Sequence, residues 1–175
     1  DSGADGLIVP MVSSPPEVDN LVQWMKYPPL GKRSFGMARA QGYGFSFDRY
    51  VKAWNDTSPL VIQIESVEGV RAAREMLSNK HVDGAMLGPY DLSGSLGIPG
   101  DLENERVVAA AAEVIAACRE AGKGCGTQLV DPDPESVERA FEQGYTFVVL
   151  SSDVFLLWKW AERMNALMNG FRARS

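Results

Sequence analysis

Short apolar runs alternate with stretches of helical periodicity along the chain. Five runs near residues 7, 60, 83, 125 and 146 have the length and composition of buried strands. Stretches such as Val67 to Ser78 carry apolar residues at helical spacing, which predicts helices packed on a sheet. This alternation is typical of a parallel α/β fold. Counting alone favours a doubly wound open sheet, because a (β/α)₈ barrel needs eight units and about 250 residues.

Capping residues, prolines and glycines predict where the helices, strands and loops begin and end. Ser14, Pro15 and Glu17 have the spacing of a capping box and predict a helix start. A long loop is predicted over residues 32–47 and a Gly-rich turn over residues 92–97. The predicted strands are 6–12, 61–64, 82–88, 125–130 and 145–150, and the later predicted helices are 47–54, 67–78, 104–120, 134–143 and 155–167.

Two acids stand at the ends of neighbouring predicted strands. Glu65 follows the run Val61–Ile64, and Asp91 follows the Gly-Pro turn after the next run. A right-handed strand–helix–strand unit places both at the carboxyl edge of a parallel sheet, where ligands bind. Two converging carboxylates suit a hard divalent cation. The alternative is structural, with Glu65 as a helix cap and Asp91 as a turn residue.

Composition narrows the class of protein. The 175 residues suffice for one core, and 17 basic against 23 acidic residues give a net charge of −6, which disfavours nucleic-acid or anionic-membrane partners. No apolar run approaches the ~20 residues of a membrane span, and no signal peptide is recognisable. Cys118 and Cys125 lack metal or redox spacing, so we expect buried thiols and a cytoplasmic location.

Three basic residues allow more than one interpretation. Arg33 and Arg39 can hold a substrate carboxylate or a neighbouring subunit's acid, or be solvated loop cations. His81 precedes its strand, at the edge of the sheet opposite Glu65, so we expect a helix C-terminal or surface histidine and not a catalytic base.

Five segments of the chain together form a specific pattern: GADGLIVPMV, KYPPLGKRSFG, VIQIES, VDGAMLGPYDLSGSLG and AGKGCG. In these segments and in their order, the chain resembles the HpcH/HpaI family of metal-dependent pyruvate aldolases. The resemblance implies a (β/α)₈ TIM barrel of the phosphoenolpyruvate/pyruvate superfamily. GLIVPMV is similar to the family's fourth strand, so the chain is expected to lack strands one to three and to form a single partial domain over residues 1–175.

The resemblance also implies a chemistry. Glu65 and Asp91 would hold Mg²⁺, Mn²⁺ or Co²⁺, and Gln63 would lie beside the bound 2-keto acid. The segment Gly88, Pro89, Tyr90 and Asp91 would bind the substrate, with the backbone N–H groups of Tyr90 and Asp91 receiving its carboxylate. The metal would polarise the keto oxygen and stabilise the enolate left by carbon–carbon cleavage. The family's catalytic Arg and His would lie upstream, so no catalytic residue is expected in this chain.

The expected activity is cleavage of a 4-hydroxy-2-keto acid or 2-keto-3-deoxy sugar acid to pyruvate and an aldehyde. A related synthase using oxaloacetate, or a non-catalytic fragment that keeps the metal pair, are the alternatives. The seventh strand of the family is more apolar than Thr127 and Gln128 are, and the eighth strand would end at Ser151 and Ser152. These four positions could tune the choice of the aldehyde partner. The family forms trimers or hexamers, so residues 153–170 are expected either to pack on a neighbouring subunit or to close their own barrel.

Overall fold

The structure, a computed structural model, describes residues 1–172, so the last three residues of the predicted domain lie outside the described residues. Its strands are β1 (Leu7–Val9), β2 (Leu60–Ile64), β3 (Gly84–Leu87), β4 (Gly124–Leu129) and β5 (Phe147–Leu150). Its helices are α1 (Pro15–Met25), the 3₁₀ helix η1 (Arg39–Gly44), α2 (Phe47–Thr57), α3 (Val67–Ser78), α4 (Pro89–Ser95), α5 (Glu105–Ala121), α6 (Pro134–Glu142) and α7 (Asp153–Arg172).

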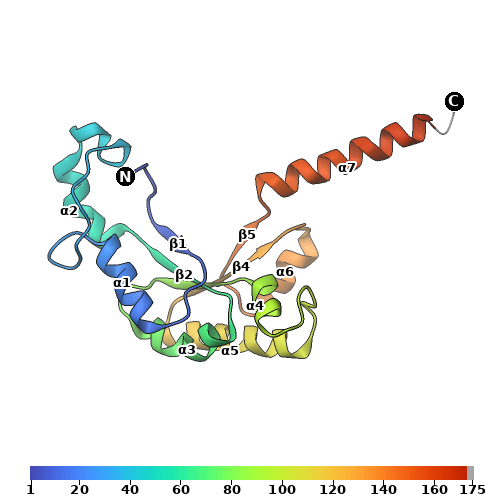
Figure 1. Cartoon of the computed structure of the whole chain (residues 1–175), viewed down its shortest axis with the longest axis horizontal. Coiled ribbons are helices and arrows are strands. Elements are labelled where there is room, and N and C mark those ends of the chain that lie inside the picture. Colours follow the sequence, from blue (N-terminus) through green and yellow to red (C-terminus); the bar gives the residue numbers. More distant parts are fainter. Residues whose placement is uncertain (173–175) are drawn as a thin grey trace.

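The five strands form one parallel sheet in the order β1-β2-β3-β4-β5. In a doubly wound sheet the strand order reverses at one point, so the open-sheet alternative is wrong. Here each connection advances to the next strand in the same direction, and crossovers of the usual right hand then place their helices on the same face of the sheet. The result is a parallel half-barrel, in which the strands fan out above α3 and α5 (Figure 1).

The core lies between this sheet and its helices. Along β2 the side chains of Leu60, Ile62 and Ile64 are fully buried against the helical layer, whereas Val61 and Gln63 are only half-buried. Side chains alternate between the two faces of a strand, so Val61 and Gln63 point to the open face. The open face therefore carries the functional side chain of this strand, and the helical face carries its packing.

The predicted Gly-rich turn over residues 92–97 is wrong, because residues 89–95 form the helix α4. Pro89 occupies the first turn, where a missing N–H costs nothing. Leu92 and Ser93 are completely buried, and the Ser93 hydroxyl donates to the Tyr90 carbonyl at 2.6 Å and accepts from the Gly100 N–H at 2.8 Å. Tertiary burial and these two bonds outweigh the glycine content of the segment.

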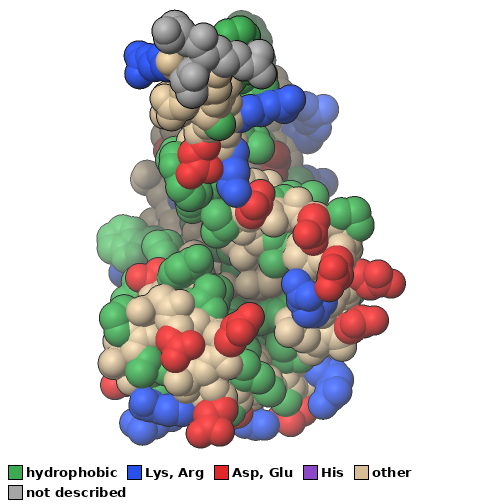
Figure 2. Space-filling view, turned by 90° about the vertical axis from the view of Figure 1, so that its right-hand side faces the viewer, with side chains coloured by type: hydrophobic (Ala, Val, Ile, Leu, Met, Phe, Trp, Pro, Cys, Tyr) green, Lys and Arg blue, Asp and Glu red, His purple; other side chains and the backbone are tan. Residues whose placement is uncertain are grey.

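The last helix differs from all others in its surroundings. α7 has no buried residue, although Leu156, Leu157, Trp158 and Trp160 are large and apolar. It extends away from the half-barrel (Figure 1), and apolar side chains lie in patches between charged ones on the side of the molecule that it occupies (Figure 2). Among the helices of residues 1–172, none combines the length and apolarity needed to cross a bilayer.

Candidate functional site

The ends of β2 and β3 bring the predicted residues together. Ile64 pairs with Leu87, and the Gly88 N–H donates to the Ile64 carbonyl at 3.2 Å, so Glu65 and Gly88 continue side by side beyond the ladder. The first turn of α4 follows directly and carries Asp91. This arrangement places both acids at the carboxyl edge of adjacent strands, as the strand–helix–strand pattern predicts.

Glu65 is the most constrained side chain of the site. It is only 5% exposed, and its carboxylate accepts from the Gln63 amide at 2.8 Å on Oε1 and from the Met11 N–H at 2.9 Å on Oε2. Burial raises the pKa of Glu65, the Met11 bond opposes this, and the nearby charge of Asp91 raises the pKa further. Repulsion between two carboxylates is the electrostatic arrangement that a bound cation relieves.

Glu65 is not a helix cap, so the structural alternative for this residue is wrong. The cap of α3 is Ser66, whose hydroxyl accepts from the Gly69 N–H at 3.0 Å. Glu65 is thus left without a role in ending or starting a helix, and its two acceptor bonds serve only to hold it in place.

The backbone at Gly88 passes so close to the Glu65 side chain that this position requires glycine. A Cβ on Gly88 would collide with the Oε1 of Glu65, so only glycine lets the β3–α4 connection pass this close to the carboxylate. After it, the N–H groups of Tyr90 and Asp91 lie in the first turn of α4, where a helix has no acceptor of its own for them. Tyr90 is 57% exposed, and Asp91 is also exposed.

The donor set fits a hard divalent cation with an incomplete protein shell. Within residues 1–172, no three or more His, Cys, Asp or Glu side chains gather in a metal-ligating group. A cation at Glu65 and Asp91 would therefore keep most of its positions for water or substrate oxygens, which is how Mg²⁺ is usually held.

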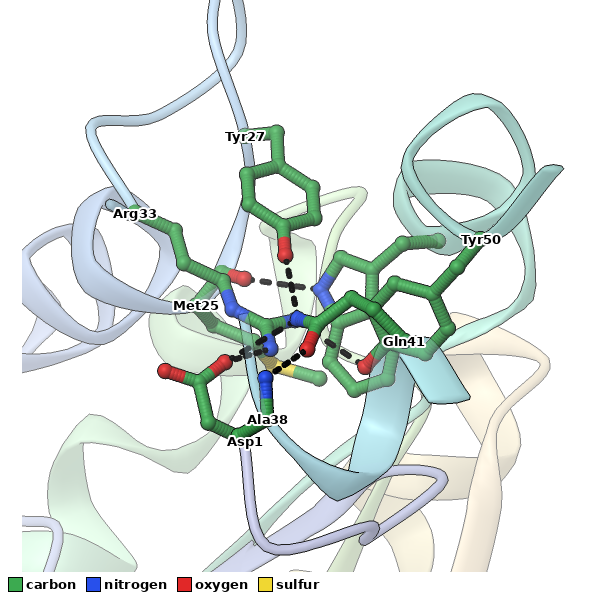
Figure 3. Close-up of polar contacts among 8 residues, drawn as sticks. Asp1, Met25, Tyr27, Arg33, Ala38, Gln41 and Tyr50 are labelled. Carbon is green, nitrogen blue, oxygen red and sulfur yellow. Dashed lines mark hydrogen bonds and ion pairs between the residues drawn. The ribbon is translucent and has the colours of Figure 1, made fainter. Parts of the chain in front are cut away.

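Arg33 is neither a free ligand for substrate nor a solvated loop cation. Its guanidinium pairs with Asp1 and lies over the rings of Tyr27 and Trp54, at 4.6 and 4.4 Å from their centres. The side chain is 11% exposed, and Figure 3 shows it enclosed by Asp1, Tyr27, Tyr50 and Gln41. This cluster packs on α2, which precedes the amino end of β2, whereas Glu65 follows the carboxyl end. Arg39 is an exposed residue at the start of η1.

His81 lies at the amino edge of the sheet, in a polar cavity that also contacts Lys26 and Asp83. Burial lowers the pKa of His81, and the charges of Lys80 and Lys26 lower it further. His81 is a half-buried residue that follows the end of α3, and its lowered pKa favours the neutral ring.

The residues expected to tune the substrate lie further along the carboxyl edge. The Gln128 amide donates to the Ser151 carbonyl at 3.3 Å, and the Ser151 hydroxyl donates to the Val130 carbonyl at 2.8 Å. Thr127 pairs with Leu87 in the ladder, and so shares the helical face with this buried residue. Thr127 thus points away from the open face that carries Gln63. Ser152 directly precedes α7 and is half-buried.

Two structural contributions to the site could not be found from sequence patterns. The Met11 N–H is a backbone group, and nothing in the side chain of Met11 signals its use. Ser95 at the end of α4 accepts from the Val67 N–H at 3.0 Å and so ties the helix after Asp91 to the helix after Glu65. Both contacts join segments that are distant in sequence.

A parallel half-barrel with two acids at its carboxyl edge is the class of α/β fold in which ligands bind at that edge of the sheet. The chain matches the HpcH/HpaI aldolase/citrate lyase family over residues 1–159. It belongs to this family.

Among its curated relatives are a hydroxypyruvate/pyruvate aldolase of Roseovarius nubinhibens and a 4-hydroxy-2-oxo-heptane-1,7-dioate aldolase of Shigella sonnei, each 34% identical. The alignments cover 90% and 95% of this chain but only 61% and 63% of those relatives. A crystal structure of a family protein from Burkholderia cenocepacia superposes with a TM-score of 0.86 at 29% identity, covering 95% of this chain and 66% of the other.

Proposed function

We propose that this chain carries the cation-binding and keto-acid-binding part of a divalent-metal-dependent aldolase. The reaction would cleave a 4-hydroxy-2-keto acid, or a 2-keto-3-deoxy sugar acid, into pyruvate and an aldehyde. The observation that carries the proposal is the buried carboxylate of Glu65, held beside Asp91 by bonds from Gln63 and Met11. Relatives named hydroxypyruvate/pyruvate aldolase and 4-hydroxy-2-oxo-heptane-1,7-dioate aldolase support it.

Each residue of the site has a proposed role. Glu65 and Asp91 would hold Mg²⁺, Mn²⁺ or Co²⁺, which when bound supplies Lewis-acid polarisation of a keto oxygen. The N–H groups of Tyr90 and Asp91 would receive the substrate carboxylate, since the start of a helix favours an anion. Gln63 would orient both Glu65 and the substrate, and Gly88 and Pro89 would set the path of the backbone around them.

The completing parts of the site would come from outside this chain. We propose that β1 to β5 are the fourth to eighth strands of a (β/α)₈ barrel, and that strands one to three bring the catalytic Arg and His. Parallel sheets are normally covered on both faces. Here Ile8 pairs with Val61 on the open face and is 50% exposed. This exposure fits the interior face of a barrel that further strands would cover.

We also propose that α7 packs on a neighbouring subunit in a homotrimer or homohexamer. α7 has 20 residues and none of them is buried, and it carries exposed large apolar residues such as Trp158 and Trp160, which is typical of a surface that packs against another chain. The free, buried thiols of Cys118 and Cys125 fit a reducing compartment such as the cytoplasm.

The test is pyruvate release from 4-hydroxy-2-keto acids by the full-length gene product with added Mn²⁺. The variants Glu65→Gln and Asp91→Asn should abolish turnover, whereas Glu68→Gln, on an exposed acid of the same loop–helix junction, should not. Retained turnover in Glu65→Gln would refute the cation site. Condensation of oxaloacetate with an acceptor, without aldol cleavage, would favour the synthase; cation binding without any turnover would favour the non-catalytic alternative.

A further inference from the structure

The turn between β1 and α1 contains a strained residue beside the site. Met11 has a φ of 58°, in the left-handed region that non-glycine residues seldom adopt. Such a conformation costs roughly 1 kcal/mol or more, and it persists only where the surroundings enforce it. Because methionine and not glycine stands at this position, we expect the strained backbone to be held by specific contacts.

With Met11 in the left-handed conformation, two successive backbone N–H groups donate hydrogen bonds to residues in or directly after β2. The Met11 N–H donates to Glu65 Oε2 at 2.9 Å, and the Val12 N–H donates to the Gln63 carbonyl at 3.1 Å. The second bond continues the β1–β2 pairing, while the first leaves the ladder for a side chain. Together they fix the turn to the same two residues that carry the acid and its amide partner.

The turn is held from its other side as well. Val12 is 3% exposed, and its carbonyl oxygen would lie only 3.0 Å from a Cβ on Gly69. Beyond it, the Glu17 carboxylate accepts from the N–H groups of Ser13 and Ser14 at 2.7 and 3.1 Å. Several contacts therefore fix the backbone around Met11, whereas the residue itself is 58% exposed.

We propose that Met11 is a positioning residue, whose left-handed backbone N–H, and not its thioether, fixes the Glu65 carboxylate for cation binding. With Oε1 held by Gln63 and Oε2 by Met11, the carboxylate cannot turn about its terminal bond, and each oxygen keeps a lone pair free. The inference rests on the proposed cation site. Outer-shell bonds of this kind typically change metal affinity by about 10- to 100-fold.

The test removes the donor and leaves the side chain intact. Replacing Met11 by the α-hydroxy acid that carries the methionine side chain converts its amide to an ester, and Mn²⁺ affinity is then measured by titration calorimetry in the full chain. Met37 is the matched control, because it is an exposed methionine whose N–H has no hydrogen-bond acceptor within residues 1–172. We expect about tenfold weaker Mn²⁺ binding with the ester at Met11 and unchanged binding with the ester at Met37.

The results distinguish a failure of the positioning role of Met11 from a failure of the proposed cation site. Equal Mn²⁺ affinity for both esters, with unfolding curves that show folded proteins, would overturn the positioning role. Met11→Leu should bind Mn²⁺ as tightly as the wild type, and a loss as large as that of the Met11 ester would instead assign the effect to the thioether and overturn the inference. Absence of Mn²⁺ binding in the wild type would overturn the proposed cation site itself, and this inference with it.

Discussion

Substituting Glu65 by glutamine should make the cation-free chain more stable at neutral pH while removing its response to Mn²⁺. Glutamine has the shape of glutamate, its carbonyl can accept from the Met11 N–H, and its amide can pair with Gln63 once that amide is flipped. What the substitution removes is a buried charge and its repulsion by Asp91, the two causes that raise the pKa of Glu65.

The sign of the pH dependence follows from that shift. The pKa of Glu65 in the folded chain lies above its ordinary value of 4.5. A carboxyl of this kind contributes its full stability below the ordinary value, and loses it as pH rises through the raised value. The advantage of Glu65→Gln over the wild type should therefore be absent in acid and present at neutral pH, in chemical unfolding without cation.

Adding Mn²⁺ should reverse the order of stability of the wild type and the Glu65→Gln variant. At a Mn²⁺ concentration 100 times the dissociation constant, a single site stabilises the folded state by about 2.7 kcal/mol. For a chain of this size that is a rise in Tm of roughly 5–10 °C. The wild type should show it, and Glu65→Gln should not.

Two controls make the result interpretable. Glu68→Gln changes an exposed acid in the first turn of α3 and should behave as the wild type. Glu65→Ala leaves the Met11 and Gln63 donors without their acceptor and should lose about 2 kcal/mol of stability. If Glu65→Gln is less stable than the wild type without cation at neutral pH, or still rises in Tm with Mn²⁺, the reasoning about this carboxylate is wrong.

Other predictions follow from the same geometry. Gly88→Ala should weaken Mn²⁺ binding by at least tenfold in calorimetry, because its Cβ would displace the Glu65 carboxylate; unchanged affinity would contradict the close approach. Mn²⁺ affinity should fall as pH falls through the raised pKa of Glu65, at higher pH than an ordinary glutamate would give, and a fall confined to the ordinary range would refute that shift. Arg33→Met should lose about 2 kcal/mol in chemical unfolding while Mn²⁺ affinity stays unchanged, and a changed affinity would link the Arg33 cluster to the site. Ending the chain before Asp153 should shift the assembly to monomers in light scattering, and an unchanged mass per particle would place the subunit interface elsewhere.

Local patterns predict most of the helices and strands and the position of the two acids at the carboxyl edge of the sheet. The helix over residues 67–78 has its predicted bounds, because an apolar stripe and a serine cap both act within a few residues. The predicted capping residue Glu17 does hold the start of α1, for the same reason. Strand ends were less well predicted: the strand expected over residues 6–12 ends at Val9, where the turn containing Met11 begins.

Long-range contacts decided what local patterns could not. Arg33 is neither free for a substrate carboxylate nor solvated, because the residues that enclose it come from the segment after α1, from α2 and from the start of the chain. The segment after Asp91 looked like a turn, but burial of Leu92 and the bonds of Ser93 make it a helix.

The sequence by itself determined a parallel α/β chain with Glu65 and Asp91 at the ends of adjacent strands, because side-chain period and strand–helix alternation are local properties. Only the tertiary structure decided that the strands follow one another in order, that Gly88 passes against the Glu65 carboxylate, and that a backbone N–H from Met11 holds it. The physical reason is that these are contacts between segments up to 54 residues apart, which no local pattern encodes.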